Sequence, residues 1–343
     1  MEDKTMTNQS VAQTITIGRT NIQVLPLGVG AMTWGQKVLM TAYGGTRSPK
    51  DEEEAFRTSL DAGITFFDTA EMYGSGNSEH RLGELAQNTK AIIATKYAPS
   101  LPFMPFLPRP ARHLQKALDD SLMRLRRPKV DLYQIHYPVS FISNKALMDQ
   151  LALAVKKGKA LSVGVSNYSA EQMREDFDAL KAYGIPLASN QVQYSLLYRR
   201  PEVNGVFDAC RELGITLIAY MPLAMGALTG KYKPGSIPSD WMRRRMGNTF
   251  RDTEISAAAE ITEKLLEIGN RYKKTPAQVA LRWVIERGAL PIVGAKDGAQ
   301  ARENAGALSF SLTKSDTDYL EESTLGWFQG TKWKYTPTYT GGA

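Results

Sequence analysis

Eight short apolar runs, separated by stretches of helical period, constrain the fold of this 343-residue chain more than any other feature. The runs are apolar on both faces, which is typical of parallel strands that are covered by helices. Eight strand and helix units in a chain of this length favour a closed (β/α)8 barrel, the TIM barrel. The predicted strands are residues 24–30, 64–68, 91–96, 130–136, 161–166, 189–193, 215–220 and 290–294.

The sequence around these units predicts additional elements. Residues 14–24 alternate in polarity about the turn residues 18–21, which predicts an N-terminal β-hairpin. Residues 254–272 form a helical stretch that no strand separates from the next helix, so we expect an extra C-terminal helix. Because no linker divides the chain, we predict one domain over residues 14–325, a flexible N-terminus at 1–13 and a C-terminal tail at 326–343.

The main alternative fold is a doubly wound dinucleotide-binding sheet, which needs a G-x-G-x-x-G turn after its first strand. In "PLGVGAMTWG" the glycines are Gly28, Gly30 and Gly35, and Thr33 stands where the third glycine belongs. This substitution argues against the alternative.

Composition limits the class of ligand and the compartment. The net charge of +7 comes from scattered basic residues without interleaved aromatics, which favours a small anionic ligand over nucleic acid. The single cysteine, Cys210, allows no intrachain disulfide and no CxxC metal motif, so we expect no metal site. No apolar run is long enough to span a membrane, and the first residues do not read as a signal peptide. These features favour a cytoplasmic or plastid stromal protein.

Three successive predicted strands end on ionisable residues, namely Asp68, Lys96 and His136, and Tyr73 follows the first of them in a short loop. Each residue alone has a structural explanation, such as a turn cap or a satisfied core histidine. Because the carboxyl ends of barrel strands share one face, their coincidence on adjacent strands predicts a functional site there.

These four residue types suit the reduction of a carbonyl group. An alkoxide that forms at the carbonyl oxygen needs a proton and hydrogen-bond donors. Tyr73 can supply the proton if a nearby cation, Lys96, favours its anion. Asp68 would keep the buried lysine charged, and His136 would donate a hydrogen bond to the carbonyl oxygen.

The motifs "GITFFDTAEMYG", "IIATKYA", "VDLYQIHYP", "VGVSNYS", "LASNQVQYSLLYR" and "GAKDGAQARENAGAL" resemble those of the aldo-keto reductases. The likeness runs from about residue 15 to about residue 325, and it extends to the chloroplast and cyanobacterial branch, to pyridoxal reductases and to potassium-channel β subunits. The resemblance implies a (β/α)8 barrel that binds NADPH and reduces aldehydes and ketones. It also implies a catalytic tetrad of Asp68, Tyr73, Lys96 and His136.

The same resemblance implies three groups of cofactor-binding residues. The nicotinamide carboxamide would be held by Ser166, Asn167 and Gln191. The stretch after the seventh strand, with Tyr220, Leu223, Gly226 and Lys231, would cover the pyrophosphate. The last motif would bind the adenosine end, with Lys296 on the 2′-phosphate; its residues are Gly294, Lys296, Gln300, Glu303 and Asn304.

Substrate choice is expected to depend on the loops at 32–49 and 97–112 and on the tail. We predict that Trp34 and Tyr97 complete an aromatic pocket for aromatic or medium aliphatic aldehydes, such as pyridoxal. Two other functions stay open: a redox-sensing regulatory subunit that binds NADPH and turns over slowly, and a barrel enzyme of unrelated chemistry. The sequence leaves the oligomeric state open.

Overall fold

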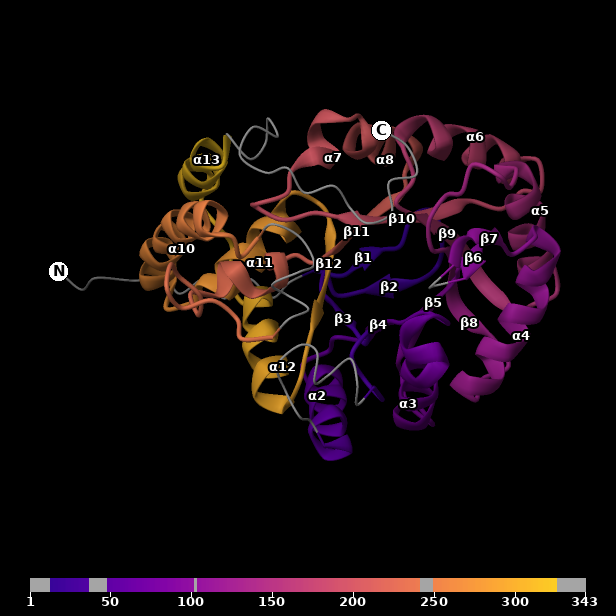
Figure 1. The fold of residues 1–343 in the computed structure, drawn as a ribbon, viewed down its shortest axis with the longest axis horizontal. Coiled ribbons are helices and arrows are strands. Elements are labelled where there is room, and N and C mark those ends of the chain that lie inside the picture. Colours follow the sequence, from indigo (N-terminus) through magenta and orange to yellow (C-terminus); the bar gives the residue numbers. More distant parts are fainter. Residues whose placement is uncertain (1–12, 37–47, 102–103, 241–248, 326–343) are drawn as a thin grey trace.

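Eight parallel strands close into a barrel in the order β10, β11, β12, β3, β4, β5, β8, β9 (Figure 1). The computed structural model describes residues 13–36, 48–101, 104–240 and 249–325. The barrel strands are β3 (Gly28–Gly30), β4 (Phe66–Asp68), β5 (Ile92–Tyr97), β8 (Val130–Ile135), β9 (Ala160–Ser166), β10 (Leu187–Gln193), β11 (Thr216–Tyr220) and β12 (Leu290–Gly294). The predicted (β/α)8 barrel is therefore confirmed.

Helices surround the barrel, as Figure 1 shows, and the expected extra helix at 254–272 is α10. They are α2 (Pro49–Asp61), α3 (Asn77–Leu85), α4 (Leu114–Leu125), α5 (Asn144–Lys156), α6 (Ala170–Lys181), α7 (Arg200–Val203), α8 (Val206–Leu213), α10 (Asp252–Tyr272), α11 (Pro276–Glu286), α12 (Gly298–Ala305) and α13 (Lys314–Ser323).

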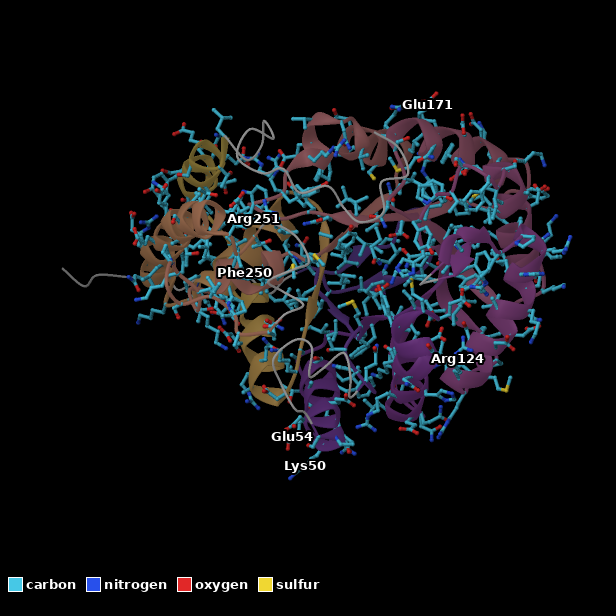
Figure 2. The ribbon with its side chains drawn as sticks, in the orientation of Figure 1. Lys50, Glu54, Arg124, Glu171, Phe250 and Arg251 are labelled. Carbon is cyan, nitrogen blue, oxygen red and sulfur yellow. The ribbon has the colours of Figure 1, made fainter. Side chains whose placement is uncertain are left out.

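The local sequence accounts for where several helices begin and which face they bury. Ser48, Ser169 and Thr275 open α2, α6 and α11 with capping boxes, in which the side chain and the backbone of the first turn bond reciprocally. Figure 2 shows Lys50 and Glu54 projecting from the outer end of α2, where they form an exposed ion pair. The polar face of this helix thus lies outward, and its apolar face packs on the barrel.

The first predicted strand, residues 24–30, is wrong in its extent. The structure divides it into β2 (Gln23–Val24) and β3, with a turn in which the amide of Leu27 donates to the carbonyl of Leu25. Pro26 lies in that turn, and a proline has no N–H to continue a strand ladder. The apolar run is therefore two elements with different partners.

The predicted hairpin is present as β1 (Ile15–Thr16) paired antiparallel with β2, and it covers the amino end of the barrel. Its Ile17 and Val24 pack with side chains of the barrel interior, including Phe66. The amide of Gly18 donates to Thr216 Oγ1 at 2.7 Å, and a Cβ on Gly18 would lie 2.4 Å from the carbonyl oxygen of Ala188. Because the hairpin covers the amino end, the carboxyl ends of the strands form the open end of the barrel, where a functional site can lie.

Side-chain alternation decides which residues face the interior. Phe66 and Ala94 pack inside the barrel, whereas Phe67 packs outside against the helices. With a period of two, Asp68 and Lys96 also face inward, at the carboxyl end. In the described part of the chain, no helix has the length and hydropathy needed to cross a membrane. The segments predicted to flank the domain lie outside the described residues, apart from residue 13.

Candidate active site

A buried ion pair joins the ends of β4 and β5. The Nζ of Lys96 donates to Asp68 Oδ1 at 2.5 Å and to the carbonyl oxygen of Thr69 at 2.8 Å. Asp68 is the register partner of Ala94 on β5. Lys96 lies two residues beyond Ala94, toward the carboxyl end of that strand. The Lys96 side chain is 0% exposed and that of Asp68 2%, so both charges lie in a low-dielectric interior.

The second oxygen of Asp68 is also occupied. Gln191 Nε2 donates to Asp68 Oδ2 at 2.9 Å, and Gln134 Nε2 lies at 3.4 Å from the same oxygen. Gln134 in turn accepts from Ser189 Oγ at 3.2 Å. Sequence reasoning missed Gln134, although it lies two residues before His136 and so shares its face of the strand. These contacts hold the carboxylate from three directions.

Burial disfavours the charged form of Lys96. It lowers the pKa of Lys96 below its ordinary value, and the carboxylates of Asp68 and Glu79 oppose that change. Without Asp68 the ammonium would lose both its nearest counter-charge and a hydrogen-bond acceptor. The charge of Lys96 therefore depends on this carboxylate.

Tyr73 and His136 lie beside the ion pair, so the four predicted residues come together. The Nζ of Lys96 is 5.2 Å from the centroid of the Tyr73 ring. The Tyr73 and His136 rings meet edge to face with centroids 5.5 Å apart, and both residues are half-buried. Burial, and then the charge of Lys96, lower the pKa of His136 well below its usual range, so its imidazole is neutral at neutral pH. Its Nδ1 is buried without a hydrogen-bond partner.

A second ion pair fixes the loop that carries Tyr73. The carboxylate of Glu71 accepts from the amide of Ala98 at 2.8 Å and from both terminal nitrogens of Arg109. The Arg109 guanidinium lies 4.7 Å from the centroid of the Tyr97 ring, and the Tyr97 hydroxyl donates to the carbonyl of Arg109 at 2.8 Å. Sequence reasoning missed Glu71 and Arg109, since a separation of 38 positions gives no local signal.

Trp34 and Tyr97 do not occupy the predicted pocket positions. Both side chains are 0% exposed. Trp34 packs against Phe56 and Phe67 between the barrel and α2, and its indole N–H donates to the carbonyl of Ala295 at 2.9 Å. Tyr97 follows the inward-facing Lys96, so strand alternation turns it outward. The structure therefore places both residues in packing, not at a substrate surface.

The predicted nicotinamide-binding residues adjoin the tetrad. Ser166 Oγ donates to the carbonyl of Gln191 at 2.8 Å. Asn167, with a positive φ of 63°, donates from Nδ2 to the carbonyl of His136 at 3.1 Å. The hydroxyl of Tyr220 donates to Asn167 Oδ1 at 3.0 Å. These contacts join the ends of β8, β9, β10 and β11 in one cluster.

The other predicted cofactor residues form two outer groups. Leu223 and Gly226 belong to the turn around η3 (Ala224–Thr229), and Lys231 is exposed just after it. At the start of α12, the amide of Lys296 donates to Gln300 Oε1 at 2.8 Å. Glu303 is exposed, whereas Asn304 is buried and donates to the carbonyl of Gly294 at 3.2 Å.

Two neighbouring strands end on glycines at the open end of the barrel. Gly30 and Gly294 are register partners on β3 and β12. A Cβ built on either glycine would meet no atom of the described residues within 4 Å, whereas one on Gly28, deeper on the same face, would clash with Phe66. This space lies beside Asp68, the register partner of Gly30 on β4, and can take part of a bound cofactor. In the described ranges, no group of three His, Cys, Asp or Glu side chains could hold a metal ion.

Comparison with known proteins assigns the family. The model of the Aldo/keto reductase family matches residues 26–324. The chain belongs to the aldo/keto reductase family. As an aldo-keto reductase it is an oxidoreductase that acts on carbonyl compounds.

Its relatives and structural neighbours cover most of the chain. It is 34% identical to the chloroplastic pyridoxal reductase of Arabidopsis thaliana, over 88% of this chain and 83% of that protein. It is 32% identical to an aldo-keto reductase of Schizosaccharomyces pombe whose name specifies NADP(+), over 86% and 88%. A crystal structure of a thermostable aldo-keto reductase in complex with the inhibitor epalrestat superposes with a TM-score of 0.70 at 25% identity, covering 91% of this chain and 99% of the other.

Proposed function

We propose that this aldo-keto reductase reduces aldehydes and ketones to alcohols with NADPH, and that Tyr73 is the proton donor. The observation that supports this most directly is the Lys96 ammonium, paired with Asp68 and 5.2 Å from the centroid of the Tyr73 ring. A cation at that position favours the tyrosinate and so lets the phenol release its proton near neutral pH. When bound, NADPH supplies the hydride for the carbonyl carbon.

His136 would orient the substrate. Because its imidazole is neutral, it can donate one N–H to the carbonyl oxygen without adding a second positive charge beside Lys96. The donors Tyr73 and His136, whose rings are in contact, would then share the carbonyl oxygen, which gains negative charge during reduction. Such preorganised donors stabilise the transition state more than the ground state.

The cofactor would lie across the open end of the barrel. In this proposal Ser166, Asn167 and Gln191 hold the carboxamide of the nicotinamide, and Tyr220 packs beside them. Leu223, Gly226 and Lys231 would cover the pyrophosphate. Lys296, directly before the N-cap of α12, would pair with the 2′-phosphate, with Gln300, Glu303 and Asn304 near the adenine.

The test compares the native protein with Tyr73→Phe, which lacks only the hydroxyl. Turnover is followed by the loss of NADPH absorbance with a panel of aldehydes that includes pyridoxal, since one relative is named for that substrate. We expect kcat to fall by at least ~100-fold in the variant, and NADPH binding to be retained. Equal turnover in both proteins would refute the role of Tyr73.

Two further outcomes separate the alternatives. If the native protein keeps NADPH through purification but turns over none of the aldehydes, the regulatory function replaces the enzymatic one. If the native protein shows no NADPH binding, unrelated chemistry on the same barrel is indicated.

A further inference from the structure

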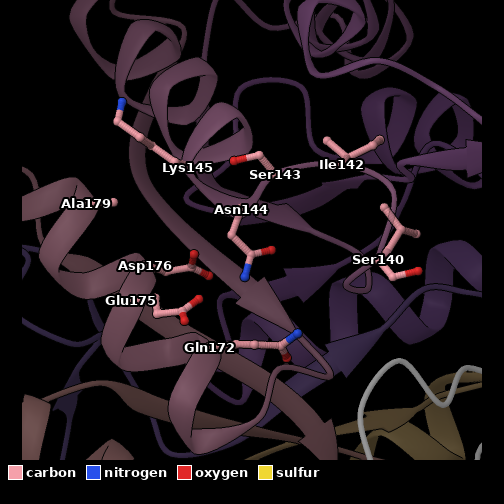
Figure 3. A pocket seen from close by; sticks show the side chains of 10 residues that line it. Ser140, Ile142, Ser143, Asn144, Lys145, Gln172, Glu175, Asp176 and Ala179 are labelled. Atoms are coloured by element: carbon pink, nitrogen blue, oxygen red, sulfur yellow. The ribbon is translucent and has the colours of Figure 1, made fainter.

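In the part of the chain that the structure describes, two carboxylates are 0% exposed, Glu79 and Asp176. Asp176 borders a hollow of about 610 Å³ between α5 and α6 (Figure 3). It has no hydrogen bond from the described residues, and burial, followed by the charge of Glu175, raises its pKa to about 8, so it is mostly protonated at neutral pH. Glu79 differs, because both of its oxygens have partners. Of the two, only Glu79 has the contacts that keep a buried carboxylate ionised.

The carboxylate of Glu79 joins α3 to β5 and to α4. Thr95 Oγ1, on the outer face of β5, donates to Glu79 Oε1 at 2.5 Å. Arg124 Nε donates to Glu79 Oε2 at 2.6 Å, and Arg124 Nη2 donates to Ser121 Oγ at 3.1 Å. Arg124 is labelled in Figure 2 beside α3 and α4, which pack against each other. Burial raises the pKa of Glu79 and the charge of Arg124 opposes that rise, so the ionised form depends on this pair.

A turn with left-handed backbone connects Tyr73 to α3. The φ values are 59° at Gly74, 55° at Ser75 and 93° at Gly76. A non-glycine residue such as Ser75 rarely adopts this conformation, so the surrounding structure must hold it there. A Cβ on Gly76 would lie 2.5 Å from Arg124 Cδ, which shows that the arginine side chain packs against the turn. The arginine that binds the buried carboxylate therefore also supports the turn after the tetrad tyrosine.

Two carboxylates tie the loop of Tyr73 to the segment around the end of β5. Glu71, which precedes Tyr73, accepts from the amide of Ala98 at 2.8 Å. Glu79, which follows it in the first turn of α3, accepts from Thr95. The two bonded residues lie on opposite sides of the tetrad lysine along the chain. The loop is thus attached before and after the tyrosine, which fixes the tyrosine relative to the lysine.

Glu79 also acts on Lys96 through its charge. Thr95 and Lys96 are consecutive, so their side chains point to opposite faces of β5, and Glu79 lies behind the barrel wall from the site. Burial lowers the pKa of Lys96, and the charges of Asp68 and then Glu79 oppose that change. Glu79 therefore influences the site through β5 and not by contact with a substrate.

We propose that Glu79 is a positioning residue for carbonyl reduction. Through Thr95 it holds the first turn of α3 on β5, and thereby the Tyr73 hydroxyl near the Lys96 ammonium. Arg124 keeps the carboxylate charged and oriented. The inference rests on the proposed function, in which Tyr73 is the proton donor. A displacement of about 1 Å at a reacting group can lower kcat by about 100-fold, so such a support has a measurable effect.

The test uses the hydroxyl of Thr95, because its removal leaves every charge in place. Thr95→Val keeps the shape of the side chain and loses the hydrogen bond, whereas Thr95→Ser keeps the hydroxyl. With the aldehyde panel and NADPH, we expect kcat to fall about tenfold in Thr95→Val and to stay near the native value in Thr95→Ser. Glu79→Gln should lower kcat at least as far, and NADPH affinity should stay the same in all of these variants.

The ratio of kcat in water to kcat in deuterium oxide separates positioning from a loss of folded protein. Slower proton transfer from Tyr73 raises this ratio in Thr95→Val, whereas a smaller folded fraction leaves it unchanged. Glu286→Gln on α11 is the matched control, since Glu286 pairs with Arg282 at 2.7 Å and both side chains are mostly buried. It should lower the melting temperature and leave kcat unchanged.

Native kcat in both Thr95→Val and Glu79→Gln would overturn the inference. An equal loss in Thr95→Val and Thr95→Ser with an unchanged isotope ratio would overturn it as well. If one of the first two variants does not fold, the other decides. The proposed function fails separately, if Tyr73→Phe turns over as fast as the native protein or if the native protein turns over no aldehyde, and the inference then fails with it.

Discussion

The contributions of Asp68 and Lys96 to the free energy of unfolding should be strongly coupled, because the two side chains form a buried ion pair. In Asp68→Asn, the Lys96 ammonium, 0% exposed, would lose its counter-charge and keep only neutral acceptors, the amide oxygen of the substituted side chain and the Thr69 carbonyl. Removing one partner of a buried pair costs about 3–5 kcal/mol, because the other charge stays buried without compensation. Lys96→Met should lie at the lower end of that range, since Gln191 and Gln134 still donate to the carboxylate.

The double variant has neither charge, so its loss should be smaller than the sum of the two single losses. We expect a coupling energy of about 2–3 kcal/mol. Urea unfolding of the native protein, both single variants and the double variant measures it. The pair of Lys145 and Asp149 is a matched control, because its lysine side chain is 72% exposed and its coupling should stay below about 1 kcal/mol. A buried pair that couples no more strongly than this exposed pair would refute the reasoning.

Two further predictions concern the open end of the barrel. Gly294→Val should weaken NADPH binding at least ~10-fold with little change in thermal stability, because its side chain would enter space that none of the described residues fills. Fluorescence titration and a melting curve measure both, and unchanged affinity would contradict the placement of the cofactor beside Gly294. Glu71→Gln should lower kcat about tenfold or more while NADPH affinity stays the same, because the loop of Tyr73 loses its ion pair with Arg109. An exchange of the two charges, Glu71→Arg with Arg109→Glu, should restore part of kcat, and a parallel loss of cofactor binding would instead indicate general misfolding.

Much of the site could be predicted because it follows from local pattern. Apolar runs that end on Asp68, Lys96 and His136 indicate strand ends, and parallel strands bring their carboxyl ends to one face. Successive side chains of a strand point to opposite faces. Since Lys96 faces the barrel interior, the next residue, Tyr97, faces outward. The prediction that Trp34 and Tyr97 line the pocket rests on their position after a strand and leaves out the direction of their side chains.

The sequence by itself determined the order of strands and helices, the hairpin, and three strand-end groups of the tetrad, since periodicity and turn residues are local properties of the chain. Only the tertiary structure decided that Gln191 and Gln134 meet Asp68 across the barrel. It also decided that Gly30 lies beside Gly294 and that Arg109 holds Glu71. These contacts depend on the register and closure of the barrel, which bring together residues far apart in sequence. Burial at those contacts then sets the pKa values, because desolvation depends on what surrounds a group in space and not on its neighbours along the chain.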